Sequence, residues 1–257
     1  MKTKTTPFII GMRDTYFEEL YKVFQNDKNA VFITADNGAP TLDRFASDFP
    51  DQYYQVGIAE QQMMGMASGL AFEGRKVYTY AIAPFVTQRI SEFVKLDQCA
   101  VNLPIVNIGI GAGYSYDIMG PTHHTVEDIT TMRVYPNLKI YSPTDSVVSK
   151  ALVQYIHDDP SPAYIRFDRV GIPVYEESEF NVNQALTDWM IKTTTGNSKY
   201  AIISTGRFVF EALSIVKKLK LKANIDVDII DIFRLKPINT ELLLSWCEKY
   251  DKIITYE

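Results

Sequence analysis

Short runs of apolar residues, rich in β-branched and aromatic side chains, alternate along the chain with longer stretches of helical period. Each short run is predicted to be a buried strand, because a strand covered on both faces consists of consecutive apolar residues. The strands expected in the first part of the chain are 30–34, 53–56, 77–81, 105–110, 138–141 and 163–167. The longer stretches predict helices, among them 58–72, 88–96 and 145–157. This alternation predicts an α/β fold, a doubly wound and mostly parallel sheet with right-handed helical crossovers.

The pattern changes after residue 170. Residues 171–197 are predicted to form a linker with a weak hairpin, and a second α/β unit follows. Its expected strands are 200–204, 227–230 and 252–256, and its expected helices are 210–219 and 240–250. We therefore predict a first domain at 8–170, a linker at 171–197 and a smaller α/β domain at 198–257. A domain that ends on its third strand is short, so the second domain is expected to be incomplete or minimal.

The composition agrees with a globular protein. Of 257 residues, 46% are hydrophobic and 22% are charged, which excludes a disordered tail, a collagen-like fibre and a coiled coil. The formal net charge is −5 and no block of basic residues stands apart, which disfavours nucleic acid and anionic membranes as partners. The two cysteines are far apart in the sequence, and no apolar stretch approaches the roughly 20 residues of a membrane helix. We expect a soluble, cytoplasmic protein.

Glu60 is the first candidate for chemistry. It lies in the sequence Val56-Gly-Ile-Ala-Glu-Gln-Gln-Met-Met-Gly-Met-Ala-Ser-Gly69, in the first turn of a predicted helix. A carboxylate there is usually a surface residue that matches the helix dipole. The small and apolar neighbours instead favour close packing, and a buried carboxylate needs a hydrogen-bond partner or a proton. Because no obvious Lys or Arg lies beside it, we expect a protonated nitrogen of a ligand as its partner.

The second candidate is the loop Gly120-Pro-Thr-His-His124, which holds two of the three histidines of the chain. Adjacent loop residues bind one metal ion poorly, and no Cys, Asp or Glu completes a ligand spacing, so no metal site is expected in this chain. A loop that follows a parallel strand lies where α/β proteins bind ligands. The alternative is a surface turn with two exposed imidazoles. The preceding Gly109-Ile-Gly-Ala-Gly113 lacks the full dinucleotide spacing and is predicted to be a close backbone turn.

The third candidate is a pair of arginines. Arg166 and Arg169 lie at and just past the end of a predicted strand, which suits an anionic group of a substrate. Pairing of these arginines with Asp168 or with Glu176 and Glu177 is an equally open alternative.

Two of these motifs, residues 57–61 and 120–124, resemble the pyrimidine-binding domain of thiamine-diphosphate enzymes. Their spacing fits, as do Ala-Pro-Phe at 83–85 between them and Tyr-Ser-Pro-Thr-Asp at 141–145. Within these enzymes, the motifs are similar to those of transketolase and 1-deoxyxylulose-5-phosphate synthase. The resemblance covers roughly residues 8–170, and residues 185–257 resemble the start of the transketolase C-terminal domain.

The resemblance implies a role for each candidate. Glu60 would hydrogen-bond N1′ of the aminopyrimidine ring and favour its imino tautomer, whose nitrogen removes the C2 proton of the thiazolium. His123 would lie over the thiazolium and contact substrate oxygens, with His124 also in substrate binding. Phe85 would stack on the pyrimidine, Asp36 would line the cofactor cleft, and Arg169 would bind a substrate phosphate.

Some positions depart from the family pattern. An ungapped alignment would place Ala83 or Val86, rather than Phe85, where transketolases carry the stacking ring. Transketolases usually have an Asp directly before Gly-Pro-Thr-His, and this chain has Met119. A histidine that helps to hold a sugar phosphate is replaced near Gly111. The donor and the acceptor therefore stay open, and an unusual or nucleotide-linked ketose is conceivable.

One half of the family's active site is absent from this sequence. These enzymes hold the diphosphate through Mg²⁺ in a separate domain marked by Gly-Asp-Gly and a later Asn, and Gly-Asp-Gly occurs nowhere here. We therefore expect thiamine diphosphate and Mg²⁺ to be held mainly by a partner chain. The chain is predicted to be the second subunit of a split transketolase, with active sites at the interface between the two chains and at least an α2β2 assembly.

The leading functional hypothesis is transfer of a two-carbon ketol unit from a ketose to an aldehyde. A second hypothesis keeps the cofactor but has decarboxylation, as in a deoxyxylulose-phosphate synthase or a 2-oxo-acid dehydrogenase β subunit. A third is a non-catalytic paralogue that only assembles with an active enzyme or regulates it. Glu60 argues against the third, because an inactive copy has no chemical need for it.

Overall fold

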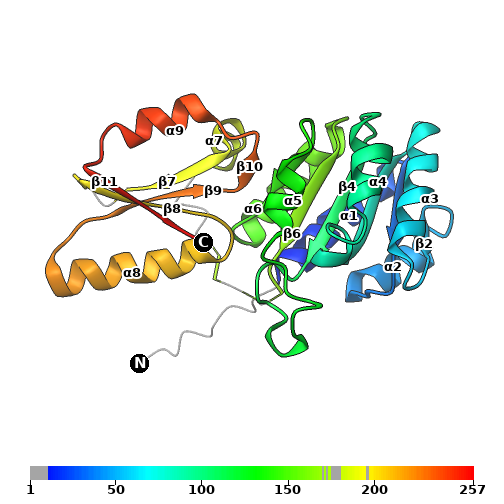
Figure 1. Ribbon diagram of the computed structural model, residues 1–257, viewed down its shortest axis with the longest axis horizontal. Helices are drawn as coiled ribbons and strands as arrows, with labels where there is room; N and C mark the ends of the chain where they lie inside the picture. Colours follow the sequence, from blue (N-terminus) through cyan, green and yellow to red (C-terminus); the bar gives the residue numbers. More distant parts are fainter. Residues whose placement is uncertain (1–10, 170, 172, 175–180, 195–196) are drawn as a thin grey trace.

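The larger of two sheets has seven strands in the spatial order β10-β5-β6-β4-β3-β1-β2 (Figure 1). These strands are β1 (Ala30–Thr34), β2 (Tyr53–Gln55), β3 (Lys76–Ile82), β4 (Ile105–Ile110), β5 (Lys139–Tyr141), β6 (Ala163–Phe167) and β10 (Arg234–Lys236). All neighbours are parallel except β10, which runs antiparallel to β5. The predicted doubly wound, mostly parallel sheet is confirmed. The structure is a computed structural model that describes residues 11–169, 171, 173–174, 181–194 and 197–257.

Helices cover both faces of this sheet because successive strand residues point to opposite sides. Phe32 of β1 belongs to a hydrophobic cluster with residues of α1, α2 and α6, whereas Val31 and Ile33 belong to a second cluster with residues of α3 and α5. These helices are α1 (Met12–Asn26), α2 (Pro40–Asp48), α3 (Glu60–Phe72), α5 (Asp128–Arg133) and α6 (Ser146–Asp158). The single helix predicted at 88–96 is instead a short α4 (Ser91–Phe93) that runs into a π-helical turn at Val94–Cys99.

The smaller sheet has four strands in the order β11-β8-β9-β7, with β7 antiparallel to β9. Its elements are α7 (Val182–Asp188), β7 (Met190–Thr193), β8 (Tyr200–Ser204), α8 (Phe208–Ala223), β9 (Asp228–Ile232), α9 (Thr240–Cys247) and β11 (Lys252–Tyr256). The prediction of a linker and weak hairpin at 171–197 is wrong for 182–193. There the buried Met190 and Ile191 join the core of the second sheet, so the segment gains a full strand.

The second domain also contributes to the first sheet. Strand β10 pairs with β5, and the backbone N–H of Ser142 donates to the carbonyl of Phe233 at 2.8 Å. Buried Asp231 accepts a hydrogen bond from the hydroxyl of Thr144. Trp189 packs against Tyr141 of β5, with ring centroids 6.0 Å apart. The two domains therefore share backbone and side-chain contacts along one edge of the larger sheet.

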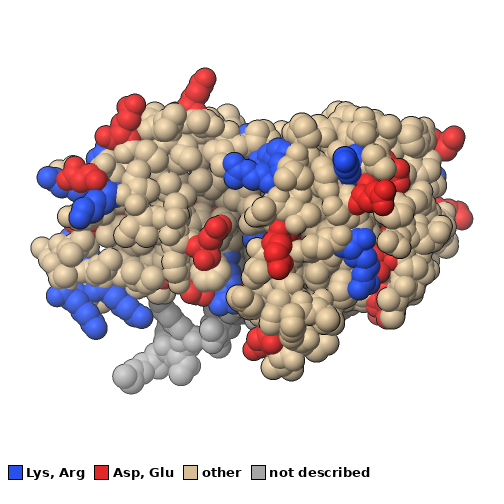
Figure 2. All heavy atoms as spheres, in the orientation of Figure 1, with Lys and Arg blue, Asp and Glu red and all other residues tan. Residues whose placement is uncertain are grey.

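The outer surface carries charges of both signs over both domains on the face that Figure 2 shows. Within the described ranges, no helix is both long and apolar enough to cross a membrane.

Candidate active site

The candidate site lies at the carboxyl edge of the larger sheet, where β1, β3 and β4 end. Asp36 follows β1, the 3₁₀ turn Ala83–Phe85 follows β3, and the loop with His123 and His124 comes after β4. Glu60 begins α3, which follows β2, the neighbour of β1. Parallel strands end at the same edge of a sheet, and this topology brings together segments that are far apart in the sequence.

Glu60 is buried, as its apolar neighbours predict. Its Oε2 accepts a hydrogen bond from Nη1 of Arg89 at 2.7 Å. The Glu60 side chain is 5% exposed and that of Arg89 is 42% exposed. The expectation that no cationic side chain lies beside Glu60 is wrong, because the turn after β3 brings in an arginine 29 residues later.

The guanidinium of Arg89 also lies on an aromatic ring. Its Cζ is 4.0 Å from the ring centroid of Phe85, a close cation–π contact. On a further side, Phe85 meets the imidazole of His123 edge to face, with centroids 5.4 Å apart. The structure thus brings together Glu60, Phe85 and His123, three residues singled out from the sequence, and adds Arg89 between two of them.

Tyr116 extends these contacts toward Arg169. Its ring centroid is 5.9 Å from that of His123, and Cζ of Arg169 is 4.8 Å from the same tyrosine ring. Burial raises the pKa of the Tyr116 hydroxyl. The tyrosine ring fills space that only glycine leaves open, since a Cβ at Gly111 would lie 2.3 Å from it. With its φ of +95°, Gly111 confirms the predicted close backbone turn. Each of these side chains contacts the next, and we call the set the site series: Glu60, Arg89, Phe85, His123, Tyr116 and Arg169.

The two adjacent imidazoles have different partners. Nδ1 of His123 lies 2.9 Å from the hydroxyl of Thr122, and Nε2 of His124 lies 3.1 Å from the carbonyl of Asp117. His124 also packs edge to face against Tyr114 at 4.9 Å between centroids. Both histidines are half-buried, so the loop is more than a turn with two exposed imidazoles. Across the described residues, no group of three or more His, Cys, Asp or Glu side chains is placed to hold a metal ion.

Arg166 and Arg169 have different surroundings. Nε of Arg166 lies 2.8 Å from Oδ2 of Asp128, a buried carboxylate that also accepts from the hydroxyl of Tyr164 at 2.7 Å. Among the described residues, Arg166 therefore forms its ion pair with Asp128, an acid that the sequence did not suggest. Arg169 is exposed and belongs to the site series. Glu176 and Glu177, the other predicted pairing partners, lie outside the described residues.

A cavity of about 570 Å³ lies between the two domains. Its lining includes Arg166 and Asp168 of the first domain and Arg207 and Glu211 of the second. Arg207 is 3.7 Å from the carboxylate of Asp168 and 2.8 Å from that of Glu211. Arg207 therefore pairs with two acidic side chains of this cavity.

Comparison with known proteins identifies the family. Residues 10–173 match the transketolase pyrimidine-binding domain family, and residues 190–257 match the transketolase C-terminal domain family. The chain belongs to the transketolase family. Transketolases depend on thiamine diphosphate, and this chain is a subunit of a split transketolase.

Two relatives and one solved structure define the likeness. One of the subunits of apulose-4-phosphate transketolase from Phocaeicola vulgatus is 32% identical over 251 residues, which cover 97% of this chain and 79% of that protein. The 1-deoxy-D-xylulose-5-phosphate synthase of Clostridium perfringens (strain SM101) is 34% identical, over 95% of this chain but only 39% of the synthase. A split-gene transketolase solved as an inactive β4 tetramer superimposes with a TM-score of 0.83 at 28% identity, covering 96% of this chain and 79% of that one.

Sequence reasoning missed Arg89, Tyr116 and Asn37. Asn37 follows Asp36 at the end of β1, and its Nδ2 is buried without an acceptor among the described residues. Asp36 itself is exposed and lies outside the site series. One sequence signal pointed to Arg89: it lies four residues after Phe85, a spacing that can bring two side chains of one turn together.

Proposed function

We propose that this transketolase subunit supplies the pyrimidine-binding half of an active site that transfers a two-carbon ketol unit from a ketose to an aldehyde. The observation that carries the proposal is a buried carboxylate, Glu60, at the carboxyl edge of a parallel sheet, in contact through Arg89 with the Phe85 ring and, beyond it, His123. Family membership supports the same assignment.

The residues present fit the pyrimidine half of thiamine diphosphate. Glu60 offers a shielded hydrogen-bond acceptor, which suits a ring nitrogen that takes up a proton. Phe85 offers a ring face, and the buried amide donor of Asn37, just after strand β1, has no acceptor within the described part of the chain. When bound, the cofactor supplies a nucleophilic thiazolium carbon. Glu60 would hold the proton at the pyrimidine nitrogen, and Phe85 would fix the plane of the ring.

The remaining predicted residues would act on the substrate and the rim of the cleft. His123 would donate to or accept from substrate oxygens next to the thiazolium, and His124 would support the same loop. Arg169 is exposed and cationic, which suits a phosphate or another anionic group of the sugar. Asp36 would line the cofactor cleft beside Asn37.

We assign the diphosphate and Mg²⁺ to a partner chain, in an assembly of at least α2β2. Support comes from exposed apolar side chains that stand close to site residues in the sequence. Ile58, two residues before Glu60, is 77% exposed, and Ile118 and Met119, just before the histidine loop, are 88% and 51% exposed. Exposed apolar side chains clustered beside a site are typical of an interface. The relative from Phocaeicola vulgatus is named as one subunit of its enzyme, which agrees with a partner chain.

A phosphorylated sugar is the substrate class that we favour. The relative from Phocaeicola vulgatus is named for a sugar phosphate, and Arg169 is the exposed cation that would bind such a group. Decarboxylation of a 2-oxo acid, as in the second relative, is the competing reaction, and only the similarity to the synthase favours it.

The test begins with affinity purification of this chain from its source cells and mass spectrometry of the chains that accompany it. We expect a partner that carries Gly-Asp-Gly and a later Asn. The purified complex is then given labelled ketose phosphate or labelled pyruvate, each with an aldehyde acceptor. Ketol transfer from the ketose supports the proposal, and preferential consumption of pyruvate would overturn it. A complex that binds thiamine diphosphate but consumes neither donor favours the non-catalytic hypothesis.

A further inference from the structure

Arg89 makes the two contacts that the proposed function assigns to the pyrimidine ring of the cofactor. Its Nη1 donates to Oε2 of Glu60 at 2.7 Å, and its Cζ lies 4.0 Å from the centroid of Phe85. A guanidinium is planar, cationic and rich in N–H donors, so it satisfies a carboxylate and an aromatic face at the same time.

We propose that Arg89 occupies the pyrimidine subsite in the cofactor-free chain and has to swing out before thiamine diphosphate binds fully. This inference rests on the proposed function and adds to it a competitor that the chain itself carries. Arg89 would then be a placeholder that controls cofactor loading.

The two occupants compete for the same two groups, Glu60 and Phe85. Glu60 is proposed to support a proton on a ring nitrogen, which requires its negative charge to be directed at that nitrogen. A guanidinium 2.7 Å away uses the same charge and weakens the attraction for a second cationic group. Phe85 is likewise covered by Arg89 at stacking distance. The cofactor gains both partners only when the arginine leaves.

The free chain also has a reason to keep Arg89 in place. The Glu60 side chain is 5% exposed, and an unpaired buried carboxylate would destabilise the fold. Arg89 neutralises it while its own head stays 42% exposed, so water can solvate the guanidinium after it leaves. Arg89 lies in the turn that precedes α4, outside any helix or strand.

The proposal has a measurable consequence: the wild type should bind thiamine diphosphate more weakly than a variant that lacks the Arg89 guanidinium. When the binding-competent state is only a fraction of the population, the apparent Kd rises by the inverse of that fraction. Removal of the Arg89 head should therefore tighten binding of thiamine diphosphate, by about tenfold if the arginine occupies the subsite for about nine-tenths of the time.

The experiment titrates thiamine diphosphate, at saturating Mg²⁺, into the complex of this chain with its partner and follows the heat of binding. Wild type is compared with Arg89→Met, which keeps an apolar stem over Glu60, and with Arg89→Ala as a second variant. Inorganic pyrophosphate is the control ligand, since it lacks the pyrimidine ring and should bind wild type and variants equally.

Arg44→Met is the matched control variant. Arg44 donates to Glu18 at 2.9 Å and lies 4.1 Å from the ring centroid of Tyr21, which reproduces the Arg89 contacts on another part of the molecule. Tighter binding of thiamine diphosphate in the Arg89 variants alone supports the placeholder. Unchanged or weaker binding in a folded, assembled Arg89 variant overturns it. A wild-type complex that binds no thiamine diphosphate would instead contradict the proposed function.

Discussion

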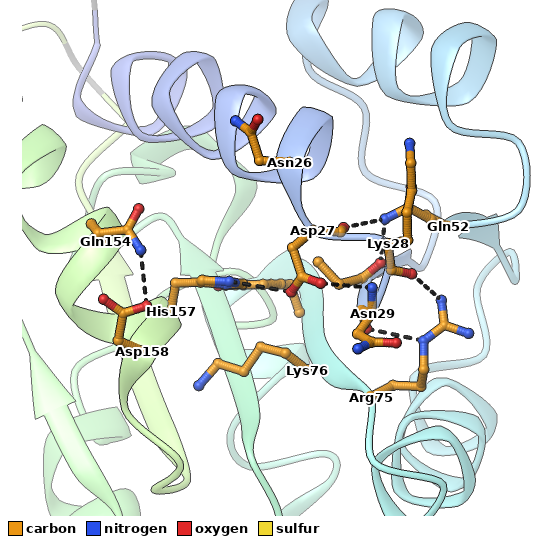
Figure 3. A network of polar contacts seen from close by, with 12 residues as sticks. Asn26, Asp27, Lys28, Asn29, Gln52, Arg75, Lys76, Gln154, His157 and Asp158 are labelled. Carbon is orange, nitrogen blue, oxygen red and sulfur yellow. Dashed lines mark hydrogen bonds and ion pairs between the residues drawn. The ribbon is translucent and has the colours of Figure 1, made fainter.

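The two ends of the larger sheet both carry cationic side chains, but Arg75 and Lys76 at one end have different partners from Arg89 and Arg169 at the other. At the amino end, shown in Figure 3, Arg75 donates to the backbone carbonyls of Lys28 and Asn29. Lys76, also at this end, donates to the carbonyl of Asp159. At the carboxyl end, Arg89 and Arg169 lie on the rings of Phe85 and Tyr116.

This difference separates a structural network from a binding site. A backbone carbonyl that a lysine or arginine caps is a fixed partner, since the chain cannot replace it without unfolding locally. A ring face is also available to any planar ligand. A cation that lies on a ring at a sheet's carboxyl edge is therefore a better indicator of a ligand site than a cation bonded to carbonyls.

His157 illustrates the amino end. Its Nδ1 is 3.0 Å from the hydroxyl of Tyr78, and its Nε2 is 3.3 Å from the carboxylate of Asp27. Burial lowers the pKa of His157, while Asp27 opposes part of that change. Burial of Lys76 likewise lowers its pKa, to about 8. Both groups link secondary-structure elements and lie at the edge opposite to the site series.

The largest effect that would sharpen the comparison is expected for Glu60→Gln. The amide cannot supply the negative charge that supports a proton on the ring nitrogen, so ketol-transfer turnover of the complex should fall by about 10²–10⁴-fold. Stability and assembly should change little, because Arg89 is exposed enough to be solvated when its partner is neutral. Steady-state rates and size-exclusion chromatography of the same preparation measure both quantities.

Glu18→Gln is the control for that experiment. Glu18 pairs with Arg44 as Glu60 pairs with Arg89, but it lies on α1. Its turnover should equal that of the wild type. Full activity of Glu60→Gln would contradict the assignment of Glu60.

A smaller effect is expected for Arg169→Gln. Loss of a charge-assisted contact to a phosphate should raise the KM for a phosphorylated donor by about 10–100-fold. The KM for the same sugar without phosphate should stay close to that of the wild type. Arg44→Gln, which removes an arginine from another tyrosine ring, is the control. Equal effects on both donors would show that Arg169 acts on the fold and not on the anion.

The smallest effect is expected at the amino end, for His157→Gln. The pKa of His157 is lower in the folded chain than its ordinary value of 6.5, so the unfolded chain binds more protons as the pH falls. Folding stability from this group is therefore complete above about pH 6.5 and is lost as the pH falls through the folded pKa. Urea unfolding at about pH 7.5 and about pH 5.5 should show a smaller loss for the variant than for the wild type.

Turnover at neutral pH should be the same for His157→Gln and the wild type. A variant with normal acid sensitivity would show that other groups govern the acid limb. A variant with normal stability and reduced turnover would contradict the assignment of a purely structural role to the amino end of the sheet.

Sequence patterns predicted the strands well where burial decides the outcome. β1 and β4 lie where the sequence has consecutive apolar residues. A strand that is buried on both faces needs apolar residues at every position, so such a run predicts it directly. β10 was missed. Its three residues, Arg-Leu-Lys, have little apolar character, and it pairs with β5, which lies far away in the sequence.

The site was predictable only in part for a similar reason. Glu60 and His123 lie in motifs of consecutive residues, and such motifs can be recognised in the sequence without knowledge of the fold. The contact between Glu60 and Arg89 depends instead on how α3 and the turn after β3 meet at the sheet edge. Inspection of the neighbours of Glu60 in the sequence alone gave the opposite expectation. Tyr116 was missed because its place depends on the absence of a Cβ at Gly111.

The strand that the second domain lends to the first sheet has a consequence for solubility. Residues of β10 occupy the hydrogen-bonding edge of β5, from Ile140 to Tyr141, which would otherwise be open. An open edge strand is a template for pairing with other chains and for aggregation. The second domain thus protects the edge of the first sheet. A first domain expressed alone would keep every residue of its site series but would expose an unpaired, aggregation-prone edge strand.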